Sequence, residues 1–224
     1  AQKPSITEAG VVIDVAGTRI EADVILVAVG RRPNTEELGL EELGVETDKG
    51  HVKVDPLTME TSVPGVFAVG DVVAGTPQLA HVGFAEGLAV AEFLATGKPA
   101  PVAYHAIPLV VYTRPEVAQV GLTERGARDS GVDVVTHQRP YGGGGRAVIR
   151  GEKRGLVKLV VSESNRLVGA SVVGPEAGEL IHELMITLGT KSDVRDVGRF
   201  IHAHPTLSET VGDTLLVAAG LGLH

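Results

Sequence analysis

The sequence contains no cysteine, which excludes disulfide bonds, thiolate zinc sites and a redox-active thiol pair built from its own residues. Aromatic residues make up only 3% of the chain, so aliphatic side chains have to fill any core. Hydrophobic residues reach 43% of the 224 residues. This is enough for one large domain or two small ones.

Positive charge is also scarce. Lys and Arg number 20 against 28 Asp and Glu, which gives a net charge of −8. Nucleic-acid binding requires basic patches, so we expect no nucleic-acid partner. Apolar stretches stay below the roughly 18 residues of a membrane span. The first residues form no apolar signal region. We therefore expect a cytoplasmic protein without a membrane partner; the alternative is a targeting segment removed before residue 1.

The chain divides into three zones, of which the first is residues 1–30. It contains two strand candidates, 11–15 and 20–30, and the second becomes an unbroken apolar run. Such a run is typical of a strand buried on both faces of a sheet. Either the rest of the chain covers this strand, or the chain starts inside a domain. The second zone, 31–98, holds two short strand candidates and one helix, expected at 51–55, 66–69 and about 79–95.

The third zone, 105–224, groups its strands and helices instead of alternating them, which favours an α+β fold. Strands are expected at 107–112, 117–120, 132–136, 156–161 and 167–173. Helices are expected to begin near residues 123, 175, 192 and 207, and 142–145 is interpreted as a flexible turn. One side of the last helix is apolar, through Leu207, Val211, Leu215 and Ala218. That side suits either the core or a two-fold interface.

A short apolar stretch, 66–70, ends at Asp71 and is followed by a loop and a helix. In open α/β folds, ligands bind beyond the carboxyl ends of strands, where aspartate can accept hydrogen bonds from sugar hydroxyls. The helix starts at Leu79, Ala80 and His81, and its first N–H groups can stabilise an anion. On these residues alone, an ordinary turn aspartate and an ordinary first-turn histidine stay open as alternatives.

The strongest candidate is the segment 202–209, with the sequence HAHPTLSE. His204 precedes Glu209 by five residues, across a turn into a helix, so that an imidazole–carboxylate pair can form. The carboxylate would fix the tautomer and raise the basicity of the imidazole, as a general acid/base requires. The alternative is two surface histidines beside a glutamate in the first turn of a helix.

No metal site is expected, because the histidines lack metal-ligand spacing and no carboxylate cluster joins His202 and His204. Glycines are abundant, but no G-x-G-x-x-G follows a strand, and no P-loop or G-x-S-x-G motif is present.

Taken in order, these segments resemble the pyridine nucleotide–disulfide oxidoreductase family. The matching residues, spread over almost the whole chain, are 27–34, 63–71, 78–81, 86–87, 112–117, 120–124, 145–147, 167–170, 173–175 and 202–209. The last segment is most similar to that of the dihydrolipoamide dehydrogenases. Glutathione reductases look similar around His-Pro-Thr but differ nearby.

The resemblance implies an α+β dimerisation domain over residues 101–224, preceded by partial α/β segments. These segments would be the end of an NAD-binding domain at 1–30 and part of an FAD-binding domain at 31–100.

The resemblance also implies roles for single residues. Contacts to FAD or NAD would be made by Gly30, Asp71, Leu79, Ala80 and His81. Gly30 would lie near the nicotinamide, Asp71 at the ribityl chain and Ala80 at the flavin. His204 would be the catalytic acid/base and Glu209 its orienting partner, and they would reach the active site of the other subunit of a homodimer.

The implied activity is FAD-dependent oxidation of dihydrolipoamide with NAD as acceptor, and the implied partner is the lipoyl domain of a 2-oxo acid dehydrogenase complex. The cysteine pair and both glycine fingerprints of the family are absent from the sequence. We therefore expect a truncated chain, a proteolytic fragment or a split gene product that does not complete the reaction alone. Two other hypotheses stay open: a non-catalytic dimerisation module without bound flavin, and a mercuric or glutathione reductase.

Overall fold

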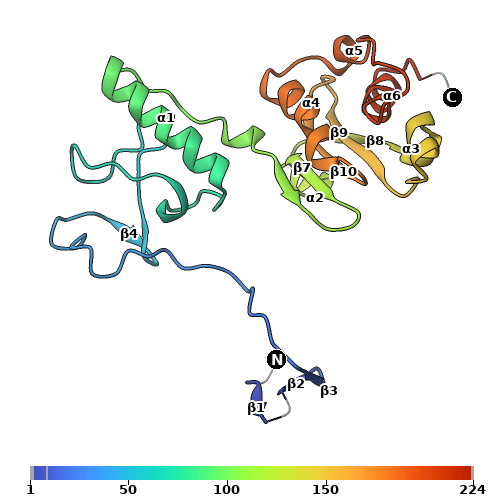
Figure 1. Ribbon diagram of the computed structural model, residues 1–224. Coiled ribbons are helices and arrows are strands. Elements are labelled where there is room, and N and C mark those ends of the chain that lie inside the picture. Colours follow the sequence, from blue (N-terminus) through green and yellow to red (C-terminus); the bar gives the residue numbers. More distant parts are fainter. Residues whose placement is uncertain (1–2, 9, 223–224) are drawn as a thin grey trace.

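A small antiparallel sheet near the N-terminus lies apart from the remainder of the chain (Figure 1). The structure is a computed structural model that describes residues 3–8 and 10–222. The sheet consists of β1 (Ser5–Thr7), β2 (Gly10–Val15) and β3 (Thr18–Ala22). The strand candidate at 11–15 is thereby confirmed, with an additional partner strand in β1.

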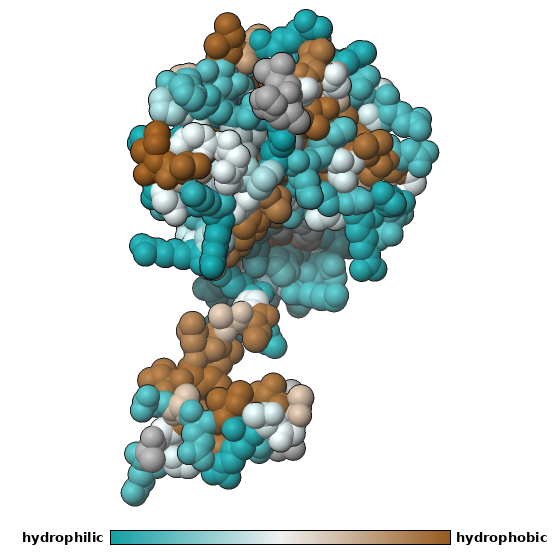
Figure 2. All heavy atoms as spheres, turned by 90° about the vertical axis from the view of Figure 1, so that its right-hand side faces the viewer, coloured by the Kyte–Doolittle hydropathy of each residue, from teal (hydrophilic) through white to brown (hydrophobic). Residues whose placement is uncertain are grey.

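The prediction of a buried strand over residues 20–30 is wrong, because the strand β3 ends at Ala22 and all of its residues are exposed. Residues 23–30 belong to no strand and form an exposed connection, with Leu26 87% and Val29 93% exposed. Figure 2 shows this connection as a hydrophobic neck below the main body of the molecule. No strand in the described part of the chain pairs with the run, and without a hydrogen-bonding neighbour an apolar segment gains neither a ladder nor a covered face.

Residues 31–104 are mostly irregular and are organised around one long helix. The short elements are β4 (Thr47–Asp48), β5 (His51–Val52) and the 3-10 turn η1 (Gly70–Val72). The predicted strand at 51–55 is therefore reduced to two residues. That at 66–69 is wrong, because only an isolated bridge between Glu60 and Phe67 forms there.

The predicted helix over 79–95 is confirmed as α1 (Ala80–Thr96). It ends at Gly97, whose φ of 67° closes the last turn in the left-handed conformation that glycine adopts readily. The 3-10 turn η2 (Tyr104–Ala106) then leads into the third zone.

A five-stranded antiparallel sheet forms the centre of the third zone, in the order β6-β7-β10-β9-β8. Its strands are β6 (Leu109–Val111), β7 (Val117–Gly121), β8 (Val134–Pro140), β9 (Leu156–Ser162) and β10 (Leu167–Val173). All five lie at or near the positions expected from the sequence. Gly169 of β10 has no room for a side chain, because a Cβ atom there would overlap the backbone of Leu122.

The helices of the third zone are α2 (Glu124–Asp129), α3 (Gly145–Arg150), α4 (Ala177–Gly189), α5 (Val194–Val197) and α6 (Glu209–Ala218). α4 packs on β7 and β10, and α6 packs on β8 and β9. The buried core between them includes Leu159, Ile181, Leu184 and Leu215. The α+β prediction is thus confirmed.

Two details of this zone differ from the predictions. Residues 142–145 are not one flexible turn; they belong to the 3-10 turn η3 (Tyr141–Gly143) and the start of α3. The apolar side of the last helix lies in the core, where Leu207, Val211 and Leu215 are buried and Ala218 is half-buried, so it is not available as an interface. The domain limits 1–30, 31–100 and 101–224 stay a prediction. None of the helices in the described residues is long and apolar enough to cross a membrane.

Candidate functional site

His204 and Glu209 lie together at the start of α6. The imidazole Nδ1 is 2.8 Å from Glu209 Oε1. Since an ionised carboxylate can only accept, Nδ1 carries the proton and Nε2 is left as the basic nitrogen. The His204 side chain is 76% exposed, whereas that of Glu209 is only 24% exposed. The carboxylate of Glu209 therefore holds the His204 ring by Nδ1, and the basic nitrogen Nε2 belongs to an exposed side chain.

Glu209 is held in its ionised form by its surroundings. Its second oxygen, Oε2, accepts the backbone N–H of Thr206 at 2.8 Å. That bond, followed by the interactions with His204 and a smaller charge interaction with His202, holds the pKa of the Glu209 carboxyl below its usual range. At neutral pH the carboxylate is therefore ready to accept from Nδ1.

Asp71 and the N-terminus of α1 form a second group of predicted residues. Asp71 lies in η1 and is exposed. Leu79 is the residue before α1 and makes no side-chain cap, so the N–H groups of Ala80 and His81 point out of the helix end. The two elements pack closely, since a Cβ atom on Gly83 would come within 3.2 Å of the Gly70 Cα.

A Cβ atom on Gly30 would meet no atom within 4 Å outside its chain neighbours, whereas the next residue contacts this group. Arg31 Nη1 lies 3.4 Å from Asp71 Oδ2, in an exposed ion pair. His81 Nε2 lies 3.0 Å from the carbonyl oxygen of Pro108 and so donates a hydrogen bond across to the third zone. Sequence reasoning anticipated neither contact.

The structure does not bring the two groups of predicted residues together. α1 and α6 lie in different halves of the molecule (Figure 1). His204 therefore does not reach Asp71, Leu79, Ala80 or His81 within one chain.

Glu86 is one of the residues that carry the family resemblance, but no role was expected for it. It is completely buried in α1. Its Oε2 accepts the N–H of Gly70 at 2.5 Å and its Oε1 accepts the hydroxyl of Tyr104 at 2.8 Å. Burial, together with the hydrogen bond to Glu86, raises the pKa of Tyr104, so the hydroxyl stays protonated and donates. The available signal was a single acidic residue inside the otherwise apolar run 82–90.

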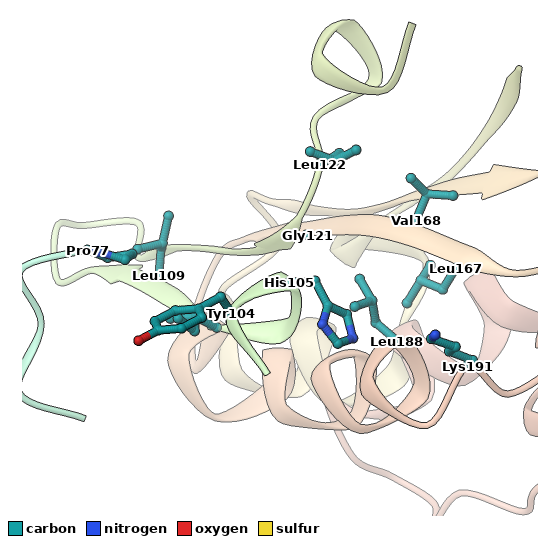
Figure 3. Close-up of a pocket in the computed structure, with 11 residues that line it drawn as sticks. Pro77, Tyr104, His105, Leu109, Gly121, Leu122, Leu167, Val168, Leu188 and Lys191 are labelled. Carbon is teal, nitrogen blue, oxygen red and sulfur yellow. The ribbon is translucent and has the colours of Figure 1, made fainter. Parts of the chain in front are cut away.

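A cavity of about 460 Å³ lies beside β7 and α4, where residues of the second and third zones meet (Figure 3). Its walls are mostly apolar, through Leu109, Leu122, Leu167 and Leu188, with His105 and Lys191 among the lining residues. None of the predicted site residues lines it. Across residues 3–8 and 10–222, no three histidine, aspartate or glutamate side chains gather as a metal site.

Two family models match the chain. The model described as pyridine nucleotide-disulphide oxidoreductase, dimerisation domain, matches residues 107–215. The model described as pyridine nucleotide-disulphide oxidoreductase matches residues 2–87.

Known proteins are similar over nearly the whole chain. Dihydrolipoyl dehydrogenase of Geobacillus stearothermophilus is 44% identical over 207 residues, which is 92% of this chain and 43% of that protein. Leghemoglobin reductase of Glycine max is 44% identical over 201 residues, or 89% of this chain and 38% of that protein. The chain thus spans less than half the length of these relatives.

Solved structures share the arrangement as well. The crystal structure of LpdA from Mycobacterium tuberculosis matches with a TM-score of 0.86 and 28% identity, over 96% of this chain and 47% of that one. The HOCl-induced flavoprotein disulfide reductase RclA from Escherichia coli, as its Cu(II) complex, matches with a TM-score of 0.87 and 26% identity, over 96% of this chain and 49% of that one.

Proposed function

Because the chain belongs to the pyridine nucleotide-disulphide oxidoreductase family, we propose that it is the C-terminal portion of a dihydrolipoyl dehydrogenase and supplies its acid/base pair. The reaction is dihydrolipoamide plus NAD⁺ giving lipoamide, NADH and a proton. The lipoyl domain of a 2-oxo acid dehydrogenase complex carries the substrate. The observation that supports this assignment is the His204–Glu209 pair, with its 2.8 Å contact and its outward-facing Nε2.

His204 takes a proton from the dithiol at Nε2, which creates the thiolate that attacks a disulfide. An imidazole suits this step, because it titrates near neutral pH and thiols titrate only slightly higher. Glu209 keeps Nδ1 protonated and stabilises the positive charge that develops on the ring. The disulfide has to come from outside this sequence, which has no cysteine.

The residues around α1 fit one end of a flavin. The outward N–H groups of Ala80 and His81 suit the pyrimidine end, where negative charge collects, and the exposed Asp71 suits the hydroxyls of the ribityl chain. The chemistry that FAD supplies when bound is two-electron transfer between the dithiol–disulfide couple and NAD. Gly30 would lie towards the nicotinamide, and Leu79 would lie beside the flavin.

The acid/base pair lies far from the residues proposed to contact flavin, which are Asp71 and the start of α1. The proposed active site therefore takes the pair from one subunit of a homodimer and the flavin contacts from the other. A set of exposed apolar side chains, on α4 and in the segment that precedes the pair, suits the interface. It consists of Ile186 on α4, 59% exposed, together with Phe200, 70%, and Ile201, 99% exposed. The contact between His202 and Glu183 holds the segment of Phe200 and Ile201 beside α4.

Replacing Ile201 by aspartate is expected to raise the dimer dissociation constant by about tenfold or more, because burying an isoleucine contributes about 1.5–3 kcal/mol. Sedimentation velocity over a concentration series measures this constant. The control is Leu94→Asp, which changes an exposed leucine on α1 and should leave the constant unchanged. A wild-type chain that stays monomeric at micromolar concentration contradicts the dimer.

The substrate is tested in a protein that joins this chain to the N-terminal part of the Geobacillus stearothermophilus relative. We expect NADH-dependent reduction of lipoamide to exceed that of oxidised glutathione and of mercuric ion by about a hundredfold or more in kcat/KM, since a site built for one substrate's groups discriminates by several kcal/mol. Preference for glutathione or mercuric ion would assign the chain to another branch of the family. A flavin-loaded protein that reduces none of the three would favour the non-catalytic dimerisation module.

A further inference from the structure

The backbone that carries His204 is held by few contacts. Residues 201–206 belong to no helix or strand. In the part of the chain that the structure describes, their backbone N–H and C=O groups make no hydrogen bond to the sheet or to α4. Ile201, Ala203, His204 and Pro205 are all exposed. Something other than the backbone must therefore set the position of the imidazole.

Local bonds join the segment only to itself and to the start of α6. The Thr206 hydroxyl donates to the Ala203 carbonyl at 2.7 Å, and the Thr206 N–H donates to Glu209. These bonds make residues 203–209 one unit. The C-terminal end of this unit is held on the third zone by the buried side chain of Leu207 and by α6, which packs on β8 and β9.

His202 is the side chain that ties the N-terminal end of this unit to another element. It lies two residues before His204, and only 15% of its side chain is exposed. Its Nε2 is 2.9 Å from Oε1 of Glu183, in the middle of α4. On the other side its ring packs against α6 at Gly212, where a Cβ atom would overlap the imidazole. The ring is thus wedged between two helices that belong to the core.

We propose that His202, anchored by Glu183, is a positioning residue that keeps His204 Nδ1 on the Glu209 carboxylate. The proposal rests on the proposed function in so far as His204 is the acid/base there. Without the His202 ring between α4 and α6, the backbone on the N-terminal side of Ala203 can move. His204 can then rotate away from Glu209. His202 acts through His204 and touches no reacting atom.

The two histidines carry their protons on opposite nitrogens, which makes the proposal measurable. His202 donates from Nε2 to Glu183, whereas His204 donates from Nδ1 to Glu209. The ¹⁵N shifts of the ring nitrogens distinguish these tautomers in neutral imidazoles. A free imidazole favours the Nε2–H form, so the Nδ1–H form of His204 reports its contact with Glu209.

The experiment is ¹⁵N NMR of the histidine rings in the 224-residue chain, together with hydrogen exchange of the Thr206 amide. In His202→Ala we expect His204 to shift to the Nε2–H form, and the Thr206 amide to exchange about tenfold faster, as for the loss of one good hydrogen bond. Glu183→Ala should have the same two effects, because it removes the acceptor of the His202 hydrogen bond. It leaves the core face of α4 intact. His202→Gln should restore the wild-type signals, because its amide Nε2 can donate to Glu183 as the imidazole does.

The matched control is His182→Ala, which removes an exposed histidine next to Glu183 on the same helix and should leave the His204 tautomer unchanged. Retention of the Nδ1–H form of His204 in both His202→Ala and Glu183→Ala would overturn the proposal. So would an equal shift in the control. These measurements need neither flavin nor dithiol, so inactivity with lipoamide would remove the proposed function without touching the positioning role of His202.

Discussion

Replacing His204 by glutamine is expected to lower kcat for lipoamide-dependent NADH oxidation by about 10²- to 10⁴-fold, the usual contribution of a positioned acid/base. Glutamine preserves the size of the side chain and a hydrogen bond to Glu209, but its amide cannot take a proton. Because the imidazole acts on the reacting thiol and does little to hold the substrate, KM should change far less than kcat. The measurement is steady-state kinetics of the joined protein described above.

Glu209→Gln provides the graded comparison. The amide oxygen can still accept from Nδ1, but the negative charge that stabilises the imidazolium is lost, so we expect a smaller fall of about 10- to 100-fold. His51→Gln, a substitution in β5 away from the pair, serves as the control and should retain full activity. An activity of His204→Gln within threefold of wild type would remove His204 from the mechanism.

Replacing Glu86 by alanine is expected to lower the free energy of unfolding by about 3–5 kcal/mol, because two buried donors lose their acceptor and a cavity is left. The donors are the N–H of Gly70 and the hydroxyl of Tyr104, both bonded to the fully buried carboxylate. Denaturant unfolding followed by circular dichroism measures this loss. Since these bonds join η1 to α1 and to η2, flavin affinity of the joined protein should fall as well.

Two variants separate the buried contact from helix propensity. Glu92→Ala changes an exposed glutamate on the same helix and should alter the unfolding free energy by no more than about 0.5 kcal/mol. Glu86→Gln keeps the shape and can accept from Gly70 while it donates to the Tyr104 oxygen, so it should retain most of the stability. A Glu86→Ala variant as stable as Glu92→Ala would show that the buried carboxylate does not hold these elements together.

Local signals were sufficient for much of the fold. α1 ends where predicted because Gly97 adopts a left-handed conformation that depends on few neighbours. α2 and α5 start where predicted because Thr123 and Asp193 cap their own helices. The pair of His204 and Glu209 could be anticipated because the two residues are only five positions apart.

The failures concern features that depend on a distant partner. The apolar runs at 24–30 and 66–69 have the composition of a strand, but a strand forms only where a neighbouring strand supplies hydrogen bonds. His202 is hydrogen-bonded to Glu183, which is 19 positions away in the sequence, and Tyr104 to Glu86, which is 18 positions away. No periodicity within either segment encodes such a contact, because it is created by the way α4 and α1 pack in three dimensions.

The exposed connection at 23–30 has a practical consequence for handling the chain. Val24, Leu26, Val27 and Val29 are each more than two thirds exposed, at 78%, 87%, 72% and 93%. A run with high β-propensity and unpaired backbone groups is a template for intermolecular strand pairing and aggregation. Asp23 on one side and Arg31 and Arg32 on the other flank the run with charges that oppose such stacking. Solubility on expression will therefore depend on these few residues more than on the net charge of the whole chain.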